Sequence, residues 1–156
     1  MQGTPMRTAL YDSHISAGAK MVDFHGFELP IWYSSIQEEH LSTRSHAGLF
    51  DVSHMGFFRF RGEDVRSWLS GLSTQEYMKF RPGTCGYSHF LDTNGHIIDD
   101  MIFAVRSEDE VLGVPNSTMT GTMLKWLESH LPSDASISIE DNSQETSIIA
   151  LQGPSS

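Results

Sequence analysis

The stretch GHIIDDMIFAVR, Gly95–Arg106, places two adjacent carboxylates in a run that is otherwise almost entirely apolar. Its aliphatic and β-branched residues predict a strand, in which neighbouring side chains point to opposite faces of the sheet. Asp99 and Asp100 therefore cannot share a face, and one of them must point inward if one face is covered. A buried carboxylate is costly unless it is hydrogen-bonded or paired, and such groups are enriched at functional sites. A functional carboxylate and a structural one, at a bulge, a sheet edge or an ion pair, remain equally open.

The segments around this stretch predict a meander. GYSHFLD, residues 86–92, leads into a turn at Thr93-Asn94-Gly95, and EVLGVP, residues 110–115, follows a second turn at residues 107–109. Short apolar runs separated by turn residues are typical of successive antiparallel strands. Three other segments have strand character, namely GFFRFR, ASISIED and TSIIALQGP, at residues 56–61, 135–141 and 146–154.

Two helices are predicted in the first half of the chain. In SSIQEEHLSTRSHAGLF, residues 34–50, Ser34 or Ser35 can serve as the N-cap and Gly48 as the stop. Residues 62–72, GEDVRSWLSGL, place valine, tryptophan and leucine at helical spacing. The strand predicted at residues 56–61 directly precedes the second of these helices.

A third helix is predicted over residues 122–131, TMLKWLESHL, with Ser117 or Thr118 as its cap. The Gly-studded, aromatic segment at residues 10–33 is interrupted by Pro30 and predicts a short strand or an irregular arm. The fold class is therefore α+β, with antiparallel sheets and flanking helices.

Composition excludes several classes of function. The 156 residues carry 20 acidic and 10 basic side chains, a formal charge of −10, which argues against a duplex nucleic acid partner. The one cysteine, Cys85, cannot form an internal disulfide, and no apolar stretch approaches the ~20 residues of a membrane span. These features predict a soluble protein in a reducing compartment.

Other familiar catalytic patterns are weak. FDVSHM, residues 50–55, contains the residue types of a hydrolase triad, but residues this close in an extended segment alternate faces. We expect Asp51 and Ser53 to turn the backbone and His54 to pack. The histidine spacings match no metal-binding motif, and the glycines form no phosphate-binding loop. No metal site is predicted.

Four motifs in succession are similar to those of the T-protein family, the folate-dependent aminomethyltransferases of the glycine cleavage system. They are GAKMVDFHGFELPIWY, AGLFDVSHMG, GYSHFLDTNGHIIDDMIF and ALQGP, and they extend from residue 18 to residue 154. The resemblance implies the N-terminal part of a three-domain cloverleaf. Residues 1–50 would supply the arm and helix of the first folate-binding unit, residues 51–141 a second antiparallel α+β unit, and residues 142–156 a return strand. We expect a truncated chain that is inactive alone.

The resemblance also implies the reaction. An aminomethyl group would pass from the dihydrolipoyl arm of a lipoylated H-protein to tetrahydrofolate, the co-substrate, with release of ammonia and formation of 5,10-methylenetetrahydrofolate. The second aspartate of IIDD, Asp100, matches the family's catalytic aspartate and would also contact folate. Tyr87 and Asn116 match residues that line the pterin and benzoate end of the folate pocket, and Met55 matches an apolar wall residue. Asp99 is expected on the opposite face, structural or solvated, with Asp100 pointing inward.

Three positions depart from the family pattern. Relatives commonly carry valine where this chain has Pro115, tyrosine at Ala104 and glycine at His96. Pro115 lacks an N–H and is expected to alter the aim of Asn116.

Two alternatives stay open. The protein could be another folate-dependent demethylase or one-carbon transferase, or a non-catalytic folate-binding relative that assists iron–sulfur protein maturation. Residues 21–30, MVDFHGFELP, favour glycine cleavage. The expected location is the cytoplasm, or the mitochondrial matrix in a eukaryote.

Overall fold

A computed structural model describes residues 4–133 and 136–156 and divides them into two compact units. The first unit comprises residues 4–54 with Ser147–Ser156, and the second is Met55–Thr146. The divisions lie a few residues beyond positions 50 and 141, where the sequence places them. Ser53 stays with the first unit because its hydroxyl donates to the Ile148 carbonyl at 3.3 Å and accepts from the Ile148 N–H at 3.0 Å.

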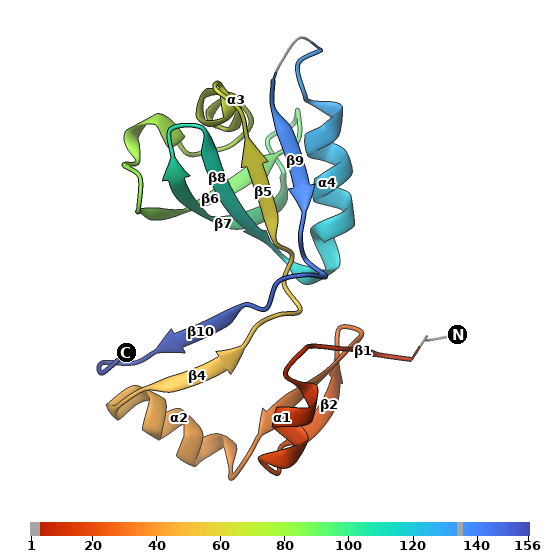
Figure 1. Ribbon diagram of the computed structural model, residues 1–156, viewed down its shortest axis with the longest axis vertical. Helices are drawn as coiled ribbons and strands as arrows, with labels where there is room; N and C mark the ends of the chain where they lie inside the picture. The colour runs from red at the N-terminus through yellow and green to blue at the C-terminus, as the bar shows by residue number, and fades with distance from the viewer. Residues whose placement is uncertain (1–3, 134–135) are drawn as a thin grey trace. The chain divides into compact units, whose positions relative to one another are not determined.

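The second unit is built on a five-stranded antiparallel sheet in the order β6-β7-β8-β5-β9 (Figure 1). The strands are β5 (Phe58–Arg61), β6 (Cys85–Leu91), β7 (Ile97–Ser107), β8 (Glu110–Pro115) and β9 (Ser138–Asp141). The predicted three-strand meander is confirmed as β6, β7 and β8, which are neighbours in the sheet. The fifth predicted strand begins with Ala135, which lies outside the described residues.

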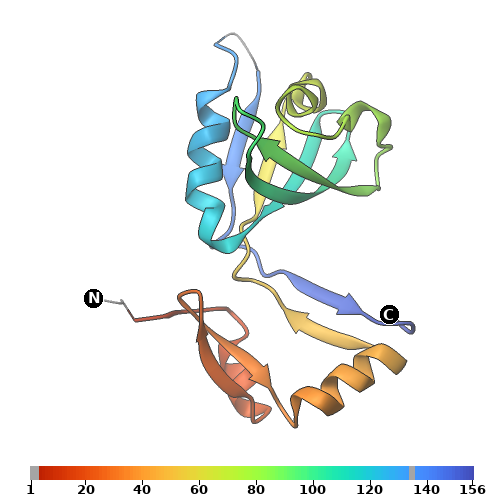
Figure 2. The ribbon, with the colours of Figure 1, turned by 180° about the vertical axis from the view of Figure 1, so that it is seen from behind.

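Two helices cover one face of this sheet. Helices α3 (Val65–Leu72) and α4 (Thr120–Ser129) contribute side chains to the same buried cluster as the strands, and Figures 1 and 2 both show α4 beside β9. The predicted cap of α4 is wrong, because Ser117 lies in a 3₁₀ turn, η2 (Ser117–Met119), that precedes the helix. The fully buried residues of this core are Phe58, Phe60, Val65, Leu69, Tyr77, Phe90, Met101, Phe103, Val105, Val111, Met123 and Leu127.

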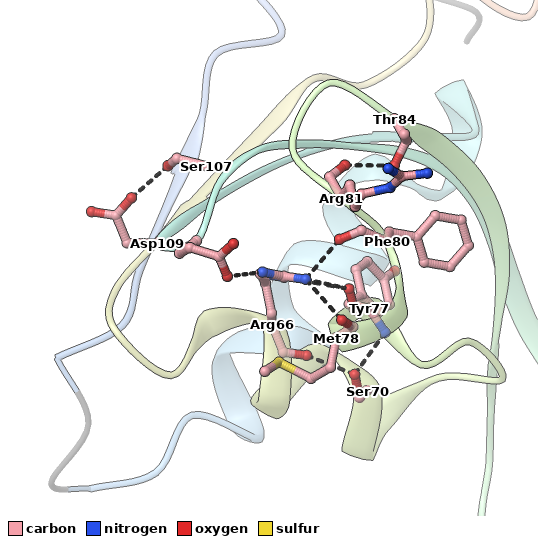
Figure 3. Close-up of polar contacts among 10 residues, drawn as sticks. Arg66, Ser70, Tyr77, Met78, Phe80, Arg81, Thr84, Ser107 and Asp109 are labelled. Atoms are coloured by element: carbon pink, nitrogen blue, oxygen red, sulfur yellow. Dashed lines mark hydrogen bonds and ion pairs between the residues drawn. The ribbon is translucent and has the colours of Figure 1, made fainter.

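A buried arginine organises the chain between α3 and β6. Arg66 is 4% exposed, and its guanidinium donates to the carbonyls of Tyr77, Met78 and Phe80, the shortest of these bonds being 2.7 Å to Phe80. Figure 3 shows the guanidinium reaching these carbonyls, and the same group forms an ion pair with Glu108. The carbonyls belong to a 3₁₀ turn, η1 (Tyr77–Lys79), and the residue that follows it. Arg66 therefore holds in place the segment from which β6 departs.

The first unit contains two smaller sheets. Strands β1 (Met6–Arg7), β3 (Phe27–Trp32) and β2 (Lys20–Phe24) form one in that order, and β4 (Gly48–Asp51) pairs with β10 (Ile149–Gln152) to form the other, as Figure 2 shows. Helix α2 (Ile36–Ser45) confirms the predicted helix, and the Ser35 hydroxyl accepts from the Glu38 N–H at its N-cap.

The segment at residues 10–33 is more regular than a short strand or irregular arm. It forms helix α1 (Tyr11–Ser16) and the β2-β3 hairpin, whose two-residue turn has φ of 52° at His25 and 84° at Gly26. Positive φ at both central residues matches the right-handed twist of the flanking strands. The sequence analysis did not predict this hairpin. Pro30 is tolerated in β3 because β1 pairs only with Phe27 and Glu28, so the Pro30 nitrogen needs no ladder partner on that edge. No helix among the described residues is long and apolar enough to cross a membrane.

Candidate functional site

The two aspartates of β7 point to opposite faces of the sheet. Asp99 lies opposite Phe90 on the helix-covered face and is 6% exposed, whereas Asp100 lies opposite His89 on the other face and is half-buried. The expectation that Asp100 is the inward carboxylate is therefore wrong, and so is the idea that Asp99 could be solvated. The sequence contained a sign of the correct orientation. Alternate residues of a strand share a face, so Arg106 lies on the same face as Asp100, and a charged arginine indicates that this face is open to solvent.

Asp100 is held by two side chains from neighbouring strands. The Tyr87 hydroxyl, on β6, donates to its Oδ2, and the amide Nδ2 of Asn116, just after β8, donates to its Oδ1 at 3.1 Å. The hydrogen bond to Asp100 is the main reason why the pKa of Tyr87 is raised above 10, with burial and the charge of Asp100 adding to it. Tyr87 is therefore a neutral hydroxyl donor at neutral pH. The structure brings together three of the four residues expected at the site.

Asn116 also contacts Asp99. Its Nδ2 lies 2.8 Å from Asp99 Oδ1, and its backbone N–H donates to Asp99 Oδ2 at 3.3 Å. Asn116 thus joins the two carboxylates that the strand separates. Pro115 does not turn this side chain away, because it is the last residue of β8 and the N–H of Asn116, the first one beyond the strand, is directed to Asp99.

Met55 begins the second unit and precedes β5. The N–H of the next residue, Gly56, donates to the Pro115 carbonyl at 3.1 Å, which brings the backbone of Met55 beside the end of β8. A Cβ on Gly56 would lie 2.6 Å from Pro115 Cγ and 2.6 Å from Thr120 Oγ1, so the absence of a side chain there permits this approach. The place of the Met55 side chain in a pocket wall stays a prediction.

The surroundings of Asp100 combine polar donors with exposed apolar surface. Tyr87 and Ile102, which face each other across β6 and β7, are 47% and 52% exposed. A carboxylate at the edge of such a surface can accept a hydrogen bond from an amine, stabilise a nearby positive charge, or take up a proton. A planar aromatic ring carrying amine groups suits this combination.

A second polar network lies in the first unit and was missed by the sequence reading. Asp51 accepts from His14 Nε2 at 2.9 Å and from the Thr8 hydroxyl at 2.7 Å, and His14 Nδ1 lies 2.7 Å from the Tyr33 hydroxyl. The predicted turn is confirmed, since the Ser53 N–H donates to Asp51 Oδ1 at 2.9 Å. The partners come from segments far apart in sequence, so no local pattern could reveal them.

The chemistry of this second network is structural. Burial of Asp51 would raise its pKa, but hydrogen bonds from Ser53, His14 and Thr8 outweigh burial and lower the pKa below its usual range. A pocket of about 330 Å³ in the first unit is lined in part by Tyr33 and Asp51. The Asp51 side chain is 1% exposed and already accepts from three residues, so it has little capacity for a ligand.

His54 packs against aromatic rings, as the sequence predicts. Its ring meets that of Phe24 edge to face, with centroids 5.3 Å apart. Burial is the main reason why the pKa of His54 is lowered; the Asp51 charge raises it by less, and the neighbouring His25 lowers it slightly further. Within the described parts of the chain, no group of three or more histidine, cysteine or acidic residues is placed to hold a metal ion.

Comparison with known proteins covers the region that contains the Asp100 cluster. Residues 10–156 match the GCVT N-terminal domain. The chain belongs to the GCVT N-terminal domain family. Two curated aminomethyltransferases illustrate the relationship: that of Geobacillus thermodenitrificans is 41% identical and that of Thermotoga maritima 39% identical, each over 148 residues and 95% of this chain.

The GCVT fold is confirmed by a solved structure. The glycine cleavage system aminomethyltransferase T from Bartonella henselae superposes with a TM-score of 0.88 at 31% sequence identity, over 96% of this chain and 41% of that protein. The GCVT chain described here spans about 40% of the length of the curated relatives it matches. Its α+β fold with antiparallel sheets is therefore that of the N-terminal portion of such an enzyme.

Proposed function

We propose that the protein carrying this sequence is the aminomethyltransferase of a glycine cleavage system. It would transfer the aminomethyl carbon of a lipoylated H-protein to tetrahydrofolate, releasing ammonia and forming 5,10-methylenetetrahydrofolate. The observation that carries the proposal is the cluster of Asp100, Tyr87 and Asn116 on the open face of the β6-β7-β8 sheet. The family membership of the chain and the names of its relatives support the same reaction.

The donor and acceptor groups of the cluster fit tetrahydrofolate as co-substrate. Asp100 offers a carboxylate to the folate amines, and its orientation is held by the Tyr87 hydroxyl and the Asn116 amide. The exposed side chains of Tyr87 and Ile102 supply apolar area for an aromatic ring system. Met55, at the start of the second unit, would add to the apolar wall.

The role of Asp100 follows from the charge that the reaction develops. The one-carbon unit exchanges its bonds to the lipoyl sulfur and to the amino nitrogen for bonds to two folate nitrogens. The carbon carries partial positive charge while the old bonds break, and the two protons lost by the folate nitrogens end on the released ammonia and the lipoyl thiol. A fixed carboxylate stabilises that charge and can take up a proton. Because Tyr87 and Asn116 already hold Asp100, little reorientation is needed when the substrate binds.

Asp100→Asn is the direct test. The amide keeps the shape and one acceptor of the carboxylate but removes its charge, so we expect turnover to fall about 10²–10⁴-fold while the dissociation constant for tetrahydrofolate changes far less. Turnover is measured with aminomethylated H-protein, and affinity by calorimetric titration, both on the full-length protein that carries this sequence. Asp109→Asn, at the β7-β8 turn, is the control because the Asp109 side chain accepts from the Ser107 hydroxyl and has no contact with the Asp100 cluster among the described hydrogen bonds. Equal losses of turnover and affinity would reduce Asp100 to a binding role.

Two alternative functions use the same cluster. Another folate-dependent one-carbon transferase would turn over a methylated small molecule and ignore the H-protein, and a non-catalytic relative would bind tetrahydrofolate without turnover. Residues 21–30, which form most of the β2-β3 hairpin, favour glycine cleavage because that motif resembles the aminomethyltransferases. Activity with and without H-protein separates the three cases. The proposed location is the cytoplasm, or the mitochondrial matrix in a eukaryote.

A further inference from the structure

Asp99 is a buried carboxylate with no basic partner among the described residues. It is 6% exposed, lies opposite Phe90, and its two side-chain hydrogen bonds both come from Asn116. Burying a carboxylate without a cation is costly, and an apolar side chain in its place would cost less. Core packing therefore gives no reason for an aspartate at this position, and its contact with Asn116 is the feature to explain.

The contacts of Asn116 determine which way its amide faces. Nδ2 lies 2.8 Å from Asp99 Oδ1 and 3.1 Å from Asp100 Oδ1. A third neighbour of Nδ2, the backbone carbonyl of Asp100 at 3.4 Å, is also an acceptor. Because all three neighbours accept hydrogen bonds, the group among them must be the NH₂ and not the carbonyl. One hydrogen serves each aspartate. The carbonyl Oδ1 of Asn116 is then directed elsewhere, and among the described residues no donor reaches it.

We propose that Asp99 is a positioning residue that acts through Asn116. By accepting from both the backbone N–H and the side-chain NH₂ of Asn116, Asp99 fixes the amide so that its second hydrogen holds Asp100 and its carbonyl is presented to a bound ligand. This inference rests on the proposed function only for the identity of the ligand, tetrahydrofolate, from whose N–H groups the Asn116 carbonyl would accept hydrogen bonds. The orientation itself rests only on the geometry of this chain.

A double-mutant cycle separates positioning from a general structural role. If Asp99 acts only through Asn116, then in the full-length protein Asp99→Asn weakens tetrahydrofolate binding about tenfold to a hundredfold. It then has no further effect in an Asn116→Ala background. A merely structural role predicts the same fold-change in both backgrounds, which would overturn the proposal. Asp141→Asn is the matched control. Like Asp99, Asp141 accepts a hydrogen bond from a backbone N–H, that of Ser143, but it does not contact Asn116.

A second measurement does not depend on folate. In the free chain, the side-chain NH₂ signals of Asn116 in a ¹⁵N–¹H spectrum should shift strongly in Asp99→Asn and stay unchanged in Asp141→Asn. If the full-length protein that carries this sequence and all of its variants fail to bind tetrahydrofolate, the proposed function fails, while these signals still decide the role of Asp99. Unshifted Asn116 signals would overturn the positioning role. Asp99→Ser, which keeps one acceptor, replaces Asp99→Asn if the latter does not fold.

Discussion

The imidazole Nε2 of His14 lies 2.9 Å from Oδ2 of Asp51, and these side chains are only 8% and 1% exposed. The contact joins α1 to the end of β4, two elements separated by more than thirty positions in the sequence. Because a carboxylate only accepts hydrogen bonds, His14 Nε2 must carry the hydrogen. This pair ties together segments of the first unit that share no strand ladder.

His14→Ala should destabilise the first unit. It leaves a buried carboxylate with one fewer donor, and we expect the free energy of unfolding to fall by about 1.5–3 kcal/mol. Amide hydrogen exchange in β4 and α1 resolves the first unit from the second. The matched control is His96→Ala, because His96 also pairs with an aspartate, Asp92 at 3.2 Å, but is 79% exposed and should contribute little. Equal losses in the two variants would contradict this expectation.

The same aspartate should make the first unit sensitive to acid. The folded pKa of Asp51 lies below its ordinary value of 3.8 because its hydrogen bonds outweigh burial. Its contribution to stability is therefore complete above that value and is lost as the pH falls through the lower folded pKa. The stability difference between the parent chain and Asp51→Asn should shrink over that range when unfolding is followed by amide exchange. A difference that stays constant to the lowest pH would exclude this linkage.

Arg66 should be among the most sensitive positions of the second unit. Arg66→Met removes the donor to the carbonyls of Tyr77, Met78 and Phe80, and we expect the free energy of unfolding to fall by about 3 kcal/mol. Arg66→Lys should recover only part of this loss, since an ammonium group lacks the planar fork. Arg61→Met, at a 44% exposed arginine paired at 3.7 Å or more, is the control in urea unfolding. A similar loss of unfolding free energy in Arg61→Met would show that the buried contacts of Arg66 are not what makes that position sensitive.

Two glycines of the second unit should respond in opposite directions to alanine. A Cβ on Gly86 would lie 2.4 Å from Phe103 and 2.8 Å from Phe80, so Gly86→Ala must displace packed rings and should cost about 1–3 kcal/mol. A Cβ on Gly121, within α4, meets nothing within 4 Å, and Gly121→Ala should stabilise by about 0.5–1 kcal/mol. Thermal unfolding of both variants checks the two signs. Stabilisation by Gly86→Ala would mean that the rings have room to move.

Local patterns in the sequence were sufficient for most of the second unit. Turn residues between short apolar runs predicted β6, β7 and β8, and the spacing of Val65 and Leu69 predicted α3. The region before Pro30 was harder, because the glycines there looked like interruptions although one of them forms the hairpin turn with His25. The predicted cap of α4, Ser117 or Thr118, was also wrong, because both residues lie in a 3₁₀ turn and no side chain caps the helix.

The candidate site was predicted in part. Strand alternation showed that Asp99 and Asp100 must differ, but which one is buried depends on the helices that cover the sheet, and these come from other parts of the sequence. The resemblance to the T-protein family selected Asp100, Tyr87 and Asn116, which the structure brings into contact. It did not reveal the contact of Asn116 with Asp99, because that pairing depends on where β8 ends.

The pairing of β4 with β10 has a consequence for the order in which the chain folds. Gly48 pairs with Gln152, so this ladder closes a loop of about a hundred residues, at a substantial cost in chain entropy. The second unit occupies that loop, and its own ends are joined where the Asn142 N–H donates to the Phe57 carbonyl at 2.9 Å. Once the second unit has folded, only a few residues remain to be closed on either side. We therefore expect the second unit to fold first and the β4-β10 ladder to form last.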